Sequence, residues 1–379
     1  MLSARRRTVE ADLRLSAAAQ HNSKALSWVD KQSPHDSFRS ILPGLPDDVA
    51  MFCLALVPRK HLHVMSAVCK RWRSFIQSKD FIFVRKEAGM LEEWLYFLTT
   101  GFEDGRSHWE VMSSPEGGIW RIPPMPGPVR VGFCTVVFDG RLLIIGGLSK
   151  DGGAASVSAD VHQYDARLNR WSMLAKMKVG RYDFACSEVN GMIYAVGGYG
   201  SNGDGLSVAE VYDPDKNEWT LIEDLRRPRY GCFACSLGGK LYVMGGRSSF
   251  TIGSSRFVDI YSPDGRSWCE MKNRGCVMVT AHAVLGKKLF CMEWRDQRVL
   301  AIFDPADNSW RKVPVPIVGS SAIRIRFGIL GHRLMLFSLD GDPAYRTLIY
   351  DPAAPAGSEW RTSAIKPSRT CLSIVTIEA

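Results

Sequence analysis

Two groups of side chains in this sequence have the chemistry to hold a metal ion. Cys232 and Cys235 form a Cys-x-x-Cys pair, the spacing that tetrahedral zinc sites use. The pair lies in a predicted strand, where residues three apart face opposite sides. No second pair and no nearby histidine completes a zinc set. We therefore expect two buried thiols and no zinc.

Histidines form the second candidate group, because clustered histidine and tyrosine ligands can hold copper. After residue 90 the chain has only four histidines, and they stand at unmatched positions of the repeat described below: His108, His162, His282 and His332. We expect no metal, no cofactor and no catalytic residue.

Arginines at matched positions form a candidate binding group. Arg130, Arg181 and Arg229 each stand about eleven residues before the start of a predicted strand. The same count reaches Val277 and Ala322 further on, so the arginines are restricted to one arc. A guanidinium group suits either an acidic ligand or a neighbouring backbone carbonyl. The arginines could therefore contact a target or brace the loops around them.

The elements that position these arginines come from a repeat. Tryptophans 120, 171, 219, 268, 310 and 360 are spaced by 51, 48, 49, 42 and 50 residues. A period near 50 indicates a repeat architecture. Double glycines precede three of the tryptophans, and a Tyr-Asp, Tyr-Ser or Phe-Asp pair precedes five of them.

Each copy predicts four short antiparallel strands, a to d. In the third copy these are strand a over 182–188, strand b over 193–196, strand c ending at Asp213 and strand d with Trp219. Asp-x-x-x-Asn-x-Trp joins c to d in three copies, where Asp and Asn form local turns. We expect these residues to build the fold, with the aromatic rings packed between sheets.

This pattern resembles the Kelch repeat, which implies a β-propeller. Cys291-Met292 and Phe337-Ser338 replace the double glycine in the last two copies, a departure that affects the local turn. Segments 94–99, 107–112 and 119–122 supply strands b, c and d of a first blade that lacks strand a. If the tail strand 371–377 fills that place, the ring closes with six blades.

The loops on one face of this propeller are irregular. That face, here called face X, carries the d–a and b–c connections, including 149–158, 199–207 and 247–255. Binding tends to use variable loops on a rigid scaffold. We therefore expect target recognition on face X around Arg130, Arg181 and Arg229, and the positive arc favours an acidic or phosphorylated segment.

Before the propeller, apolar residues follow helical spacing. Val49, Phe52, Cys53 and Leu56 fit one helical face, Pro58 breaks that helix, and further helical pieces hold Leu62 with Met65 and Val68 with Trp72. A core of about 45 residues is small for independent stability. Some of these apolar residues would therefore need a partner.

This segment resembles an F-box. Its pattern is met by Leu45-Pro46, Asp48, Leu54, Pro58, Leu62 and Val68-Cys69-Lys70-Arg71-Trp72, with Asp48 where Glu is usual and Val57 where Leu is usual. The resemblance implies a three-helix domain that docks on the Skp adaptor, and through it on the cullin and RING subunits of an SCF ubiquitin ligase. The adaptor-binding residues so implied are Leu45, Pro46, Val49, Leu54, Leu62, Val68, Cys69 and Trp72.

The predicted organisation is a disordered basic tail over 1–40, an F-box over 41–89 and a mainly β, six-bladed Kelch propeller over 90–379. The net charge of +9 is divided as +3, +4 and +2 among residues 1–40, 41–90 and 91–379. The larger domain thus lacks the concentrated basic face of a nucleic-acid binder. No apolar run is long enough to span a membrane.

The combination resembles plant F-box/Kelch proteins. It implies a non-catalytic substrate receptor whose propeller holds the protein to be ubiquitinated. Ten cysteines without a framework favour an intracellular protein of the cytoplasm or nucleus. A Kelch scaffold without ligase function remains the alternative. The target's identity does not follow from the sequence.

Overall fold

The computed structural model describes residues 40–100, 107–113, 118–128, 130–151, 154–248, 257–272, 279–294, 298–316, 324–338, 346–367 and 370–379. Two compact units divide the chain, Met1–Val57 and Pro58–Ala379. The predicted boundary after residue 89 falls inside the second unit. The predicted tail lies outside the described residues except for Ser40.

One helix, α2 (Asp47–Ala55), makes up most of what is described in the first unit. Its first turn holds Asp47 and Asp48, whose carboxylates complement the partial positive charge at a helix N-terminus. Pro46 directly precedes the helix, where a residue without an N–H group costs little. The helix ends at Leu56, whose N–H donates to the carbonyl of Phe52 at 3.1 Å.

The second unit begins with short helices separated by side-chain caps. These are η2 (Arg59–His61), α3 (Leu62–Val68), α4 (Lys70–Gln77) and α5 (Lys79–Glu87). Cys69 has extended backbone, and its sulfur accepts the N–H of Trp72 at 3.4 Å. Ser78 caps α5 in the same way through the N–H of Phe81 at 3.2 Å. The expected single helix from Val68 to Trp72 is therefore wrong, because Cys69 ends one helix and starts the next.

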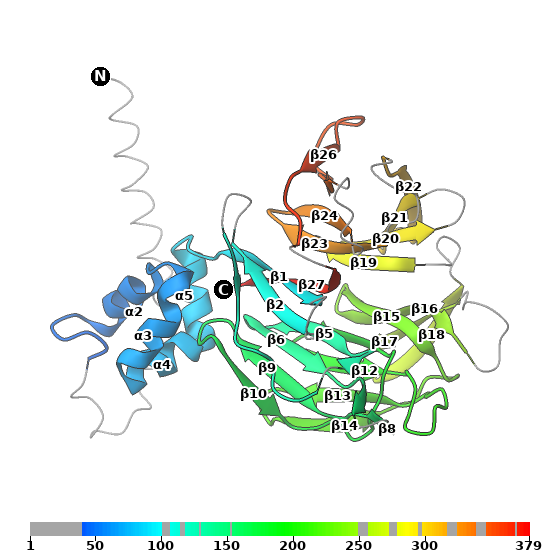
Figure 1. Cartoon of the computed structure of the whole chain (residues 1–379), viewed down its shortest axis with the longest axis horizontal. Coiled ribbons are helices and arrows are strands. Elements are labelled where there is room, and N and C mark those ends of the chain that lie inside the picture. The colour runs from blue at the N-terminus through cyan, green and yellow to red at the C-terminus, as the bar shows by residue number, and fades with distance from the viewer. Residues whose placement is uncertain are drawn as a thin grey trace. The chain divides into compact units, whose positions relative to one another are not determined.

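Six four-stranded antiparallel sheets follow, which confirms the predicted six-bladed propeller (Figure 1). The first sheet is closed by the C-terminal strand and has the order β27-β1-β2-β3. Its strands are β27 (Cys371–Glu378), β1 (Glu93–Thr100), β2 (Ser107–Met112) and β3 (Ile119–Arg121).

Arg130 and Arg181 precede the first strands of the next two sheets. The second is β5 (Cys134–Phe138), β6 (Arg141–Ile145), β9 (Val161–Asp165) and β10 (Arg170–Leu174). The third is β11 (Ala185–Val189), β12 (Met192–Val196), β13 (Ala209–Asp213) and β14 (Glu218–Ile222).

The remaining three sheets have consecutive strand order. They are β15 (Tyr230–Leu237), β16 (Lys240–Arg247), β17 (Phe257–Ser262) and β18 (Ser267–Lys272); β19 (Val279–Leu285), β20 (Lys288–Trp294), β21 (Arg298–Asp304) and β22 (Ser309–Pro314); and β23 (Ile325–Leu330), β24 (Arg333–Ser338), β25 (Thr347–Tyr350) and β26 (Trp360–Ser363).

The tail strand completes the first blade. β27, red in Figure 1, pairs antiparallel with β1 from Glu93 opposite Glu378 to Thr99 opposite Cys371, with one register shift after Leu98. Strand a of the first blade thus comes from the far end of the chain.

One expected loop is instead ordered secondary structure. Segment 149–158 forms most of a hairpin, β7 (Leu148–Asp151) with β8 (Ala154–Val157), and β4 (Arg130–Val131) adds to β7. In the third blade strand a starts at Ala185 and not at residue 182, because Tyr182 forms an isolated bridge with Tyr199. Most of 247–255 lies outside the described residues.

The repeated turn between strands c and d explains the recurring Asn and Trp. Asn217 has φ of +51°, a conformation that Asn tolerates better than most residues. It accepts a hydrogen bond from the Tyr212 hydroxyl at 2.9 Å. The Trp219 ring packs against Tyr212 in a tilted arrangement, with 5.2 Å between ring centroids, and donates to the Ala175 carbonyl of the preceding blade at 3.0 Å. The predicted packing of aromatic rings between sheets is therefore present here.

Candidate functional site

Arg181 is the most deeply buried of the three predicted arginines. One guanidinium nitrogen donates to the carbonyls of Gly197 at 2.9 Å and Val208 at 2.8 Å. The other donates to the carboxylate of Glu210 at 2.6 Å, and Glu210 is also fully buried. Arg181 thus ties the d–a connection to strand c of its own blade.

The other two arginines repeat this arrangement. Arg130 donates to Asp160 at 2.8 Å, and Arg229 donates to Asp259 at 2.6 Å and to the Val243 carbonyl at 2.9 Å. Both side chains are nearly as buried as that of Arg181. Each positive charge therefore has its own acidic partner inside the blade.

These pairs favour the bracing interpretation of the matched arginines. Contact between a target and any of the three stays a prediction, and the equivalent positions Val277 and Ala322 lie outside the described residues. Sequence reasoning missed the acidic partners, although a signal exists. Glu210 and Asp259 each stand two residues before the tyrosine of strand c.

A cavity of about 620 Å³ runs along the innermost strands of the propeller. All six blades line it, since residues from β27, β5, β11, β15, β19 and β23 all contribute. Its polar lining includes Thr135, Asp183, Thr280, His282 and Arg326. Asp183 and Gly231, which lie at the start of innermost strands on face X, line the end of this cavity that is here called its opening.

Three tyrosines stack on face X next to residues that line the cavity, because Tyr182 directly precedes Asp183 and Tyr230 directly precedes Gly231. The rings of Tyr182 and Tyr199 are 5.1 Å apart, those of Tyr199 and Tyr230 are 4.2 Å apart, and both pairs lie within 28° of parallel. All three side chains are partly exposed. The stack joins blades three and four on face X and was not predicted.

The cysteine pair adopts the arrangement expected of buried thiols. Cys232 and Cys235 are both buried in β15, and burial raises the pKa of Cys232 to about 11 and that of Cys235 to about 12. Among the described residues no group of three His, Cys, Asp or Glu side chains is arranged to hold a metal ion.

The four histidines are dispersed over the propeller. His108 lies on β2, His162 is buried on β9, and His332 occupies a turn with φ of +58°. His282 stacks on Phe233 at 4.2 Å in the central cavity. The structure does not bring them together.

In the first unit the predicted adaptor-binding residues fall into two groups. Leu45, Pro46 and Val49 are exposed, as are Phe52 and Leu56 on the same helix, whereas Leu54 is 3% exposed. Positions 49, 52 and 56 follow i, i+3 and i+7, so they share one face of α2. Because Leu54 is buried, it has almost no surface for a partner to contact.

In the second unit Val68 and Cys69 are exposed and Trp72 is partly exposed. Leu62 is fully buried, so it stabilises the helices and presents no docking surface. Cys69 also caps α4, which gives this residue a structural reason to be present. Val64 and Phe83 add apolar surface that the prediction did not include.

Arg59 is a functional candidate that sequence reasoning missed. Its side chain is 2% exposed and donates to the carbonyls of Glu92 at 2.8 Å and Ile377 at 2.7 Å. The guanidinium group also lies 4.4 Å from the centre of the Trp94 ring. Burial lowers the pKa of Arg59. This arginine therefore anchors the start of the helical segment to strands β1 and β27, and no local sequence pattern points to it.

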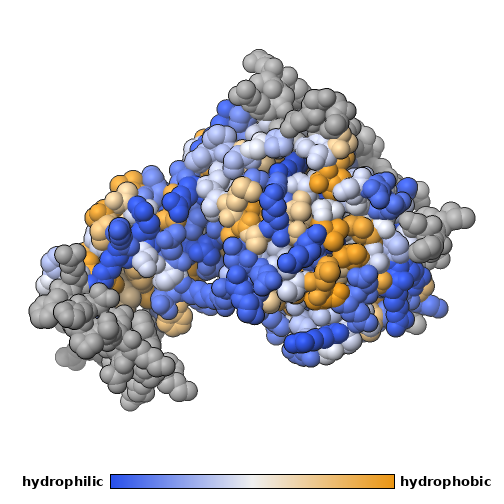
Figure 2. All heavy atoms as spheres, turned by 90° about the horizontal axis from the view of Figure 1, so that it is seen from below, coloured by the Kyte–Doolittle hydropathy of each residue, from blue (hydrophilic) through white to orange (hydrophobic). Residues whose placement is uncertain are grey.

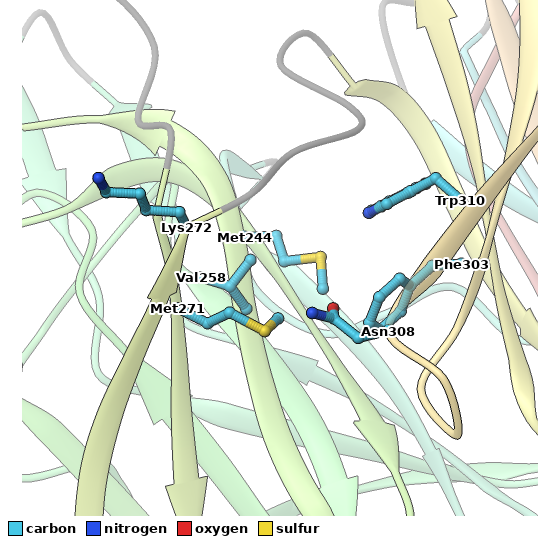
Figure 3. A pocket seen from close by; sticks show the side chains of 7 residues that line it. All are labelled: Met244, Val258, Met271, Lys272, Phe303, Asn308 and Trp310. Carbon is cyan, nitrogen blue, oxygen red and sulfur yellow. The ribbon is translucent and has the colours of Figure 1, made fainter.

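A second cavity, between blades four and five, is too small for a ligand. Figure 3 shows Met244 and Met271 beside Asn308 and Phe303, around a space of about 10 Å³. That volume is at the lower limit for one water molecule. Figure 2 shows another side of the protein, where hydrophobic residues lie among many hydrophilic ones. Exposed apolar residues on the outer strands include Met173 and Leu221.

Comparison with known proteins defines the class of this chain. The F-box domain family model matches residues 42–84, and the Kelch-repeats domain model named for KLHDC2, KLHL20 and DRC7 matches residues 132–337. A solved structure titled "Structure of YjhT" matches with a TM-score of 0.54 at 12% identity, covering 68% of this chain and 91% of that one. That likeness supports the propeller fold alone.

Full-length relatives narrow the class to a family. An F-box/kelch-repeat protein of Arabidopsis thaliana, At1g67480, is 53% identical over 89% of this chain and 90% of its own length. A second from the same plant, At1g27420, is 38% identical over 89% of this chain and 97% of its own length. The chain belongs to the F-box/kelch-repeat family.

Proposed function

We propose that this protein is the substrate-recognition subunit of an SCF-type ubiquitin ligase. The observation that carries the proposal is the presence of an F-box and a Kelch propeller in one chain. The F-box would dock the Skp adaptor, which connects to the cullin and RING subunits. The propeller would hold the protein that is ubiquitinated and degraded.

Exposed apolar side chains support the adaptor-docking half of the proposal. Leu45, Val49, Phe52 and Leu56 are each 39–44% exposed, and Val68 is 61% exposed. An apolar face of this kind would lose its contact with water on binding. The predicted contacts that are at least partly exposed are Leu45, Pro46, Val49, Val68, Cys69 and Trp72.

Face X supports the target-binding half. It combines the β7–β8 hairpin, the tyrosine stack and the opening of the central cavity. The propeller would act without catalytic residues, because the transfer chemistry belongs to other subunits of the ligase. We place this function in the cytoplasm, the nucleus or both. Among the described residues no helix is long and apolar enough to cross a membrane.

Adaptor binding tests this proposal directly. The double variant Leu45→Ala, Pro46→Ala removes exposed apolar surface at the start of α2. We expect the full chain to co-purify with a Skp adaptor and the double variant to lose that partner, because the contact depends on apolar burial. Both proteins should show the same thermal unfolding of the propeller.

A matched control separates this effect from a general loss of apolar surface. Met173→Ala changes an exposed apolar residue on β10 of the propeller, and it should keep full adaptor binding. Co-purification of the adaptor with the Leu45→Ala, Pro46→Ala variant at the normal level would contradict the proposed docking. It would favour a Kelch scaffold without ligase function.

A further inference from the structure

Three consecutive blades place one residue each at the same point of the cavity opening. Gly132, Asp183 and Gly231 each follow a matched arginine by two positions, and their φ values are +63°, +49° and +61°. The N–H of Asp183 donates to the Gly132 carbonyl at 2.8 Å, and the N–H of Gly231 donates to the Asp183 carbonyl at 2.7 Å. These bonds link the three blades at the opening on face X.

Asp183 departs from the residue that this backbone favours. Glycine adopts positive φ without strain, whereas an L-residue with a side chain does so at a cost. The equivalent positions in the neighbouring blades both hold glycine. The aspartate therefore adds a carboxylate to the opening against the local conformational preference.

The carboxylate of Asp183 has no partner within the part of the chain that the structure describes. Among the described residues it has no hydrogen bond or ion pair, whereas Arg130, Arg181 and Arg229 all have acidic partners. The side chain is open to solvent in the cavity mouth, yet the surrounding protein displaces enough water to raise the pKa of its carboxyl group. An unpaired, partly desolvated negative charge favours a cationic partner.

The tyrosine stack stands beside this charge. Tyr182 precedes Asp183 in the chain. The loss of surrounding water raises the pKa of Tyr199, and the neighbouring charge of Asp183 adds to that shift. Aromatic faces attract a guanidinium or ammonium group. The carboxylate and the stack thus offer two features that suit the same kind of side chain.

The other ionisable side chains that line the cavity bear on whether it would bind a basic or an acidic side chain. Arg130 is neutralised by Asp160. Arg326, on β23 of blade six, donates to the Thr280 carbonyl at 2.8 Å. The side chain of His282 is exposed to the cavity, yet the loss of surrounding water and the charge of Arg326 lower its pKa to about 4. Arg326 is therefore the charge in this lining that could attract an acidic residue, and it provides the competing hypothesis.

We propose that the opening of the central cavity on face X binds an arginine or lysine side chain of the target protein, with Asp183 as its counter-charge and Tyr182, Tyr199 and Tyr230 as an aromatic wall. This inference rests on the proposed function, because it names the chemistry of the target segment. It replaces the acidic segment that the matched arginines suggested. Those arginines are buried and already paired.

Peptide selection on the purified full-length chain tests the proposal. The probe is a displayed library of random dodecapeptides, and the strongest peptide is then titrated by fluorescence anisotropy. We expect arginine or lysine to be enriched at one position. Its replacement by glutamine, or the protein variant Asp183→Asn, should weaken binding by roughly tenfold or more, because a desolvated charge contact is lost.

Two variants guard against misfolding as the explanation. Asp183→Gly copies the residue found in the neighbouring blades, so it should unfold at the wild-type temperature or above and still lose the basic preference. Asp264→Asn removes one negative charge from an exposed c–d turn on the opposite face, and it should bind the peptide normally. Tyr199→Leu should weaken binding by about three- to thirtyfold, the range of a cation–π contact.

Three outcomes would overturn the inference. They are the absence of any enriched peptide, enrichment without a basic residue, and enrichment of acidic residues that Arg326→Gln abolishes. The selection does not involve the adaptor, and Asp183→Asn should retain adaptor co-purification. A failed selection with intact adaptor binding therefore rejects this inference alone, whereas a lost adaptor rejects the proposed function.

Discussion

The ion pair between Arg181 and Glu210 joins the third blade to its connections on face X. Neither side chain is exposed. Arg181 also donates to two backbone carbonyls, and Glu210 also accepts hydrogen bonds from two backbone N–H groups. Removal of one partner leaves a buried charge without compensation. Such a loss costs far more than the net contribution of an intact buried pair.

We therefore expect Arg181→Ala to lower the free energy of unfolding by about 3–5 kcal/mol. Chemical denaturation of the full chain measures this directly. The double variant Arg181→Met, Glu210→Gln removes both charges, so it should recover part of the lost stability. Wild-type stability of Arg181→Ala, together with lost target binding, would show instead that this arginine contacts the target.

The arginines also show where residue-level prediction stopped. Their matched spacing identified a structural feature, but the sequence left their role open between target contact and bracing. The choice depended on which acidic residues strand c brings within reach, namely Asp160, Glu210 and Asp259. Those contacts join residues about thirty positions apart and follow from the blade's geometry.

Among the elements, β27 comes last in the sequence but belongs to the first blade. It is the innermost strand of the first blade and pairs with β1 along most of its length. It also supplies the Ile377 carbonyl that Arg59 binds. One short strand thus contributes to ring closure and to the anchoring of the helical segment.

Removal of residues 370–379 should expose the whole edge of β1. Unpaired strand edges favour aggregation, so we expect the truncated protein to be largely insoluble, or to melt well below the full chain. Light scattering and a thermal melt of the soluble fraction measure the two effects. A soluble truncated protein with the wild-type melting temperature would show that β27 does not hold the ring closed.

Prediction of elements succeeded where a local pattern repeats. Glycine pairs, the Asn turn and the tryptophan of strand d located the blades, because each recurs at the same position of the repeat and favours the same local structure there. The β7–β8 hairpin was missed because no equivalent hairpin recurs in the described parts of the other blades and its residues lack strict alternation. Likewise Cys69 was read as part of a helix, although its cap ends one helix and begins another.

For the molecule as a whole, the structure and the family together describe an F-box and a Kelch propeller in one chain. The F-box presents exposed apolar side chains, and the propeller presents a cavity opening with an unpaired carboxylate and an aromatic stack. The sequence identified both halves of this architecture. It did not distinguish the paired charges of Arg130, Arg181 and Arg229 from the carboxylate of Asp183, because paired and unpaired charges look the same in a sequence.

The half-life of a trapped target tests the account most directly. Proximity labelling with the Leu45→Ala, Pro46→Ala variant should identify proteins that the propeller holds without degrading them. The half-life of such a protein is then measured in cells that produce either the wild-type chain or this variant. We predict a shorter half-life with the wild-type chain, and equal half-lives would contradict a role as substrate receptor.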